Sequence, residues 1–143
     1  MLQRRLCRFD ARRWEQHAAK GRKLLHFFQE REGREQSVLC PGAENAPHTY
    51  WVFPILAEEP DRLTEELVRQ DFDATQGQSL CVVPPPNDRR EMEAIFAQTM
   101  LDKMVFLPFY PELPLDEAQR MAAIACRLCF SITFQENLSQ VHS

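Results

Sequence analysis

Two cysteines near the carboxyl end, Cys126 and Cys129, have the C-x2-C spacing found in zinc knuckles and in redox-active motifs. A structural zinc site needs four ligands, and neither a second cysteine pair nor paired histidines accompany this one. A redox C-x-x-C normally opens a helix after a strand, whereas this pair lies inside a helical pattern. The spacing therefore predicts two small side chains packed on a helix, and no metal site.

The serines and histidines form no pattern that indicates nucleophilic catalysis. No G-x-S-x-G motif occurs, and no serine has a sequence context that would activate it. His17 and His26 fall in a helical stretch, and for His48, which precedes an aromatic segment, a structural or solvent-facing role is favoured. The four glycines are scattered and form no loop that could cradle a phosphate. We predict no catalytic residue and no nucleotide site in the chain.

Composition narrows the class of protein further. The chain has 143 residues, the size of one domain, and its net charge of −4 argues against a nucleic-acid partner. No apolar stretch is long enough to span a membrane, and the first residues do not resemble a secretory signal. Five cysteines, an odd number without regular spacing, indicate reduced thiols. We therefore expect a cytoplasmic protein with no membrane partner.

The elements that would position these residues alternate between helices and short strands. Periodicity predicts helices over 10–31, from Pro60, over 91–103 and from Leu115, and strands over 48–56, 80–83 and 105–107. Pro54 cannot donate to a strand ladder, so its strand should lie at a sheet edge or end there. The order indicates an α/β or α+β domain with a small sheet covered by helices, and leaves parallel and antiparallel pairing open.

Several segments resemble the carboxyl-terminal part of the DegT/DnrJ/EryC1/StrS aminotransferases, pyridoxal-phosphate enzymes of the aspartate-aminotransferase fold that aminate keto-sugars. The matching pieces are residues 51–54 (WVFP), 61–63 (DRL) and 107–111 (LPFYP), and the first predicted helix resembles the one entering the family's small domain. The resemblance covers roughly residues 4–128. It implies a small antiparallel sheet of three to four strands packed against helices. We expect this aminotransferase-like small domain over residues 1–130 and a divergent tail over 131–143.

The resemblance also implies what the chain lacks. Family members hold pyridoxal phosphate in a large amino-terminal domain, as a Schiff base on a lysine. The three lysines here, Lys20, Lys23 and Lys103, lie in no stretch resembling the family's lysine motif, so no catalytic or cofactor-binding residue carries over. The expected function is a small domain related to keto-sugar transamination but inactive without a cofactor-binding domain. Where the family has glycine after the second helix, Asp71 should occupy a left-handed helix cap.

Two functions remain open beside that of a truncated gene product. As the lid of an aminotransferase, the domain would face a sugar substrate through the loop 75–79, with the polar groups of Thr75, Gln76 and Ser79, although a plain polar turn is the favoured interpretation of this loop. As a non-enzymatic interaction or oligomerisation module, it would bind a large-domain or full-length homologue, or a second copy, through exposed apolar side chains. The aromatic candidates for that surface are Trp51, Phe53, Phe106 and Phe109.

Overall fold

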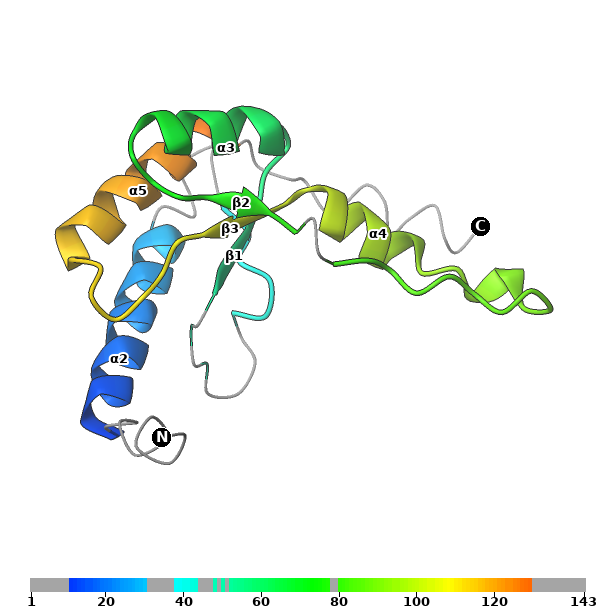
Figure 1. The fold of residues 1–143 in the computed structure, drawn as a ribbon, viewed down its shortest axis with the longest axis horizontal. Coiled ribbons are helices and arrows are strands. Elements are labelled where there is room, and N and C mark those ends of the chain that lie inside the picture. Colours follow the sequence, from blue (N-terminus) through cyan, green and yellow to red (C-terminus); the bar gives the residue numbers. More distant parts are fainter. Residues whose placement is uncertain are drawn as a thin grey trace, which may run out of the picture.

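The computed structural model describes residues 11–30, 38–43, 48, 50, 52–77 and 80–129. In chain order they form α2 (Ala11–Gln29), β1 (Phe53–Leu56), α3 (Pro60–Arg69), β2 (Thr75–Gln76), the short 3-10 helix η1 (Arg90–Met92), α4 (Ile95–Asp102), β3 (Met104–Leu107) and α5 (Leu115–Leu128). The strands make one antiparallel sheet in the order β1-β3-β2 (Figure 1). Within the described residues, this small antiparallel sheet and its helices confirm the predicted fold class.

The sheet has one buried and one partly exposed face. Along the central strand β3, Val105 and Leu107 are buried, whereas Met104 and Phe106 keep part of their surface exposed. Residues opposite each other in an antiparallel ladder share a face, and the register places Pro54 of β1 beside Phe106. We call the face of Val105 the inner face and the face of Phe106 the outer face. One-sided burial of this kind is usual for antiparallel sheets.

Helices α2, α3 and α5 supply the rest of the core. Contacts join α2 to α5 and α3 to α5, and α3 also touches β2 and β3. Each helix buries residues three or four positions apart, because this spacing returns side chains to one helix face. Their fully or almost fully buried side chains include Leu24, Phe28, Leu63, Leu67, Met121, Ala122 and Ala125. Pro54 lies on the edge strand β1, as its missing N–H predicts.

The end of α3 has the cap geometry that the sequence predicts at Asp71. Asp71 has φ 66°, in the left-handed region. Its N–H donates to the Val68 carbonyl at 3.0 Å, and the N–H of Phe72 donates to the Leu67 carbonyl at 2.9 Å. These two bonds and the contact of buried Phe72 with the core make a Schellman motif. The prediction of a left-handed cap is confirmed, on a residue that adopts this conformation less readily than glycine.

Three predicted elements differ from the structure. Residues 80–83 form no strand, and the third strand is Thr75–Gln76 instead. The valines of this segment favour a strand, but no neighbouring strand lies beside them and the prolines that follow cannot donate to a ladder. The helix predicted over 91–103 is shorter, because η1 and two residues outside any helix or strand precede α4. The strand predicted over 48–56 is reduced to Phe53–Leu56, since Tyr50 has φ 51°, which is incompatible with an extended chain.

Cys126 and Cys129 pack in the core, as their helical setting predicts. Cys126 lies on α5 and Cys129 directly after it, with exposed fractions of 4% and 1%. Burial, with a smaller effect of Cys126, raises the pKa of the Cys129 thiol to about 12. Among the described residues, no group of three or more potential ligands is arranged to hold a metal ion. Both cysteine side chains belong to the hydrophobic core of the described structure.

Candidate functional site

Thr75 and Gln76, predicted to face a substrate, lie on strand β2 with different surroundings. Thr75 pairs with Phe106, so its exposed side chain belongs to the outer face of the sheet. Gln76 is partly buried, and its Nε2 donates to the Asp61 carboxylate at 2.6 Å, which ties β2 to the first turn of α3. Ser79 lies outside the described residues. Both side chains make internal hydrogen bonds, since the Thr75 Oγ1 donates to the Gln76 carbonyl at 3.1 Å, but the Thr75 side chain lies on an accessible surface.

Gly77 stands where the sheet meets the segment that follows it. A Cβ atom here would come within 3.1 Å of the Phe106 ring and 3.2 Å of the side chains of Leu80 and Leu101. Contacts this short leave little room for any other residue. The N–H of Leu80 also donates to the Gly77 carbonyl at 2.8 Å. Gly77 therefore allows two distant parts of the chain, around Leu80 and Leu101, to close against the end of the outer face.

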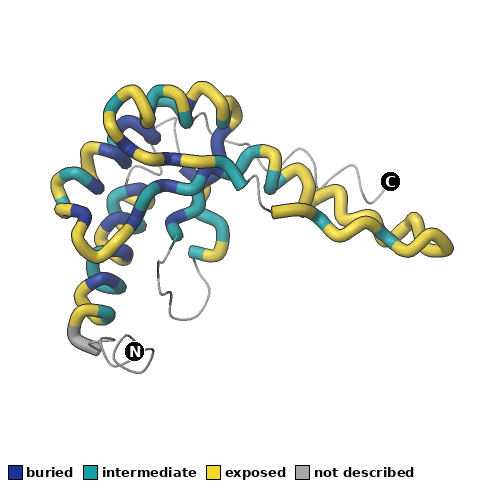
Figure 2. The backbone as a smooth tube through the Cα atoms, viewed as in Figure 1, coloured by how far each residue is buried: buried dark blue, intermediate teal, exposed yellow. Residues whose placement is uncertain are grey.

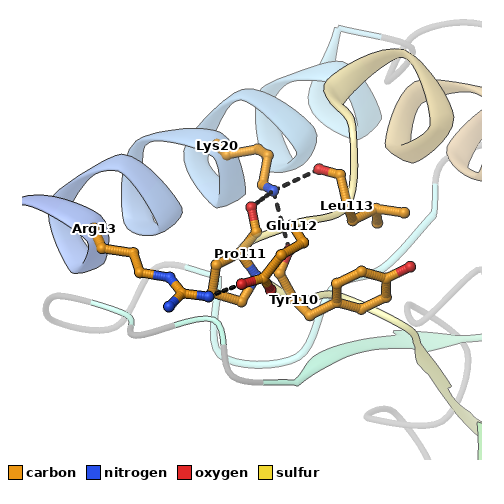
Figure 3. Close-up of polar contacts among 6 residues, drawn as sticks. All are labelled: Arg13, Lys20, Tyr110, Pro111, Glu112 and Leu113. Atoms are coloured by element: carbon orange, nitrogen blue, oxygen red, sulfur yellow. Dashed lines mark hydrogen bonds and ion pairs between the residues drawn. The ribbon is translucent and has the colours of Figure 1, made fainter. Parts of the chain in front are cut away.

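Lys20 is bound to the linker that precedes α5, as Figure 3 shows. Its Nζ donates to the carbonyl oxygens of Tyr110, Pro111 and Leu113 at 3.0, 2.8 and 2.6 Å. The ammonium also lies 5.5 Å from the centre of the Phe109 ring. Burial lowers the pKa of Lys20, whereas bonds to three carbonyl oxygens favour the charged form. All three N–H donors are used, so this lysine fixes the linker to α2.

The contacts of the lysines do not fit a pyridoxal-phosphate Schiff base. Such a lysine must present a neutral amine in a desolvated pocket with a phosphate site nearby. Lys20 is held by three carbonyls, and Lys103 forms an ion pair of 2.7 Å with Glu58. Lys23 is exposed on α2. Beside Lys20 lies an open pocket of about 320 Å³, but its Arg13 is already paired with Glu112 (Figure 3).

A second buried contact joins α2 to the chain before β1. His17, 3% exposed, has its Nε2 2.9 Å from the Tyr50 carbonyl oxygen, so Nε2 carries a proton and donates this hydrogen bond. Its buried Nδ1 has no hydrogen-bond partner within the described structure. The Tyr50 ring packs directly on Gly21, where any Cβ would overlap it. These are structural roles, and periodicity gave no signal for the His17 contact because its partner, Tyr50, is 33 residues away in the sequence.

The largest departure from sequence reasoning is a projecting arm, residues 80–102 (Figure 1). None of its residues is buried, and Figure 2 shows it exposed along its length. Its exposed apolar side chains include Val83 and Ile95, with exposed fractions of 80% and 67%. Residues 80–87 and 94–101 carry no charge at all. These two uncharged runs were the available signal for an apolar surface in this region.

The sequence predicted four exposed aromatic side chains for an interaction surface, and the prediction is wrong for two of them, Phe53 and Phe109. Phe53 and Phe109 are 2% and 5% exposed, because they pack on each other with ring centres 5.6 Å apart inside the core. Phe106 is partly exposed on the outer face, and Trp51 lies outside the described residues. The exposed apolar side chains gather on the arm instead.

Comparisons with known proteins identify no relative of this chain, so candidate functional surfaces are identified from the structure alone. No protein-family model matches the chain, and a search of curated proteins gives no match. Of the helices in the described ranges, none is both long and apolar enough to cross a lipid bilayer. Two surfaces therefore stand out as candidates for function: the outer face of the sheet, with Thr75 and Phe106, and the arm.

Proposed function

We propose that this chain is a small domain of the DegT/DnrJ/EryC1/StrS aminotransferase type, related to pyridoxal-phosphate-dependent transamination of keto-sugars. It contributes no catalytic residue and packs against a cofactor-binding domain that lies elsewhere, in the same protein or in another. The observation that carries the proposal is the one-sided sheet, whose inner face is buried while Pro54, Phe106 and Thr75 leave the outer face accessible.

Three further features support this proposal. The antiparallel sheet covered by helices is the architecture that the family resemblance implies. Asp71 adopts the left-handed conformation at the position where the family has glycine. The proline-rich stretch 107–111 leads from β3 toward α5 and is fastened to α2 by Lys20, so it has a defined place in the fold.

The outer face would act as part of a lid. A closing domain excludes water from the site and adds wall contacts to the substrate. The Thr75 hydroxyl is the group best placed for this role, because its side chain is exposed. Its Oγ1 donates to the Gln76 carbonyl at 3.1 Å, so it would accept a hydrogen bond from a sugar hydroxyl. Gln76 would contribute only if it released Asp61. The cofactor, and every covalent step, belongs to the other domain.

Docking onto a cofactor domain tests the proposal directly. The probe is the cofactor domain of a DegT-type aminotransferase, prepared without its own small domain and loaded with pyridoxal phosphate. We expect the chain to bind it in a calorimetric titration and to change the circular dichroism of the cofactor band. Thr75→Lys should weaken binding at least tenfold, whereas the control Gln29→Lys, which puts the same charge on an exposed position of α2, should not. Absence of binding by the unmodified chain would refute docking.

The non-catalytic part of the proposal has its own test. The chain is mixed with pyridoxal phosphate at micromolar concentration, reduced with borohydride and mapped by mass spectrometry. We expect only substoichiometric labelling, mainly on the exposed Lys23 and absent from Lys23→Arg. A stoichiometric adduct on Lys20 or Lys103 would show that the chain holds the cofactor itself.

The arm favours a second candidate function, that of an oligomerisation module. The base of the arm, at Leu80 and Leu101, closes against the end of the outer face, but the most exposed apolar side chains of the arm, Val83 and Ile95, play no part in the lid argument. An apolar surface of this kind usually marks a place where a protein associates.

A further inference from the structure

A cavity of about 270 Å³ lies beside the edge strand β1, apart from the arm. Its walls come from α2, with Leu25, from the turn at 40–43 and from the chain that leads into β1. None of the described residues that line it is an aspartate, glutamate, lysine or arginine. Walls of this kind favour an uncharged ligand, because a charge taken out of water needs a partner of opposite sign.

Aromatic rings form part of the cavity wall. The rings of His48 and Tyr50 have centres 5.2 Å apart, and those of Tyr50 and Phe53 are stacked with centres 5.9 Å apart and 17° between their planes. Aromatic rings pair at centre distances of roughly 4.5–7 Å, so a flat aromatic ligand would extend this series. Pro41 and Pro54 add apolar walls. An apolar cavity of about 150 Å³ can hold benzene, so the volume here leaves room for a second ring.

We propose that this cavity binds a small neutral aromatic compound of one or two rings that carries a hydroxyl group. Two polar groups of the lining residues suit that hydroxyl. Burial raises the pKa of Tyr50 more than the exposed Arg22 lowers it, so the Tyr50 hydroxyl keeps its proton and can donate. The Nε2 of His48 donates to the Gly42 carbonyl, which leaves Nδ1 of the neutral ring as an acceptor.

The cavity and the proposed lid surface lie at opposite edges of the sheet. The strand order β1-β3-β2 puts the cavity beside β1 and Thr75 on β2, with β3 between them. Of Pro54, Phe106 and Thr75 on the outer face, only Pro54 lines the cavity. The cavity proposal uses neither the family resemblance nor Thr75, so each of the two proposals can fail without the other.

Calorimetric titration of the full chain with 2-naphthol tests the choice of ligand. This probe has two aromatic rings and one hydroxyl, and it is neutral at pH 7. We expect saturable binding of one molecule per chain. The matched compound 2-naphthoate has the same rings and a carboxylate, and it should bind at least tenfold more weakly because no cation is among the described lining residues. Absence of saturable 2-naphthol binding, or equal affinity for the two compounds, overturns the proposal.

Substitutions test where the compound binds. Ala43→Trp fills the cavity from the turn and should weaken 2-naphthol binding at least tenfold. The control Ala94→Trp puts the same side chain at an exposed position of the arm and should leave the affinity unchanged.

Tyr50→Phe keeps the ring, removes the hydroxyl and should weaken binding severalfold, and far-ultraviolet circular dichroism checks that each variant is folded. Unchanged affinity in both Ala43→Trp and Tyr50→Phe overturns the proposal. Loss of binding in Ile95→Lys would place the compound on the arm and would overturn it as well.

Discussion

The body of this domain and its arm are both rich in apolar residues, but they use them in opposite ways. In the body, Leu67 and Val105 are completely buried between helices and sheet. In the arm, Val83 and Ile95 are largely exposed, and the two runs that contain them, 80–87 and 94–101, carry no charge. A cluster of solvent-exposed apolar side chains without charged neighbours indicates a surface that binds another protein. The comparison therefore separates the part that stabilises the fold from the part that is available to a partner.

The reactivity of cysteine thiols should differ most strongly between the body and the arm. Cys129 of the body is buried with a pKa of about 12, whereas Cys81 of the arm is exposed. At pH 8 a thiol with this pKa has about a thousandfold less thiolate than one of ordinary pKa near 9. Iodoacetamide labelling followed by peptide mapping should therefore modify Cys81 quickly and Cys129 only after unfolding. Comparable rates for the two would contradict the buried position of Cys129.

The same raised pKa makes the folded state sensitive to alkaline pH. Because the pKa of Cys129 is higher in the folded than in the unfolded chain, its contribution to stability is complete below pH 9. The contribution is lost as the pH rises toward 12, where the folded-state thiol ionises. Urea unfolding at pH 8 and pH 10.5 should show a fall in stability that is smaller in Cys129→Ala. An equal fall in both proteins would assign the effect to other groups.

Truncation of one apolar side chain in each region sharpens the comparison. Leu67→Ala should lower the free energy of unfolding by about 3 kcal/mol, because it leaves a cavity in the core. Ile95→Ala, at an exposed position of α4, should change it by no more than about 0.5 kcal/mol in the monomer. Both are measured by urea unfolding at low protein concentration. A large loss from Ile95→Ala would place that side chain in the monomer's core.

Gly21→Ala tests a close contact in the body that no local pattern predicts. Alanine in place of a helical glycine normally stabilises by about 1 kcal/mol. Here the added Cβ overlaps the Tyr50 ring, so we expect a loss of about 2 kcal/mol instead. Thermal unfolding gives the sign of the change. Once Tyr50 is replaced by alanine, the overlap is removed. The double variant Gly21→Ala/Tyr50→Ala should therefore be more stable than the single variant Tyr50→Ala.

The smallest expected effect is a gain at the cap of α3. Asp71→Gly should raise stability by up to about 1 kcal/mol, because glycine adopts the φ of 66° without a Cβ penalty. Asp73→Gly is the matched control, since Asp73 is also exposed but does not have a positive φ, and it should bring no gain. A loss of stability in Asp71→Gly would contradict the cap geometry.

Local features of this protein could be predicted from sequence alone. The helices that became α2, α3 and α5 follow from residues spaced three and four apart, and Pro54 predicts an edge because proline has no N–H. The left-handed cap at Asp71 was also predicted and is confirmed. For the candidate site, the sequence pointed to the segment that contains Thr75, but not to its place on β2. Such features depend on neighbours in the chain.

Only the tertiary structure decided which side chains are available. Lys20 donates to three carbonyl oxygens about ninety residues further along the chain. The Tyr50 ring leaves room only for glycine at position 21, and Phe53 and Phe109 are buried in the core. The valines at 82 and 83, with strand-forming side chains, lie in an arm because no strand is beside them to pair with. Burial and pairing depend on contacts between distant segments, and these form only when the whole chain packs.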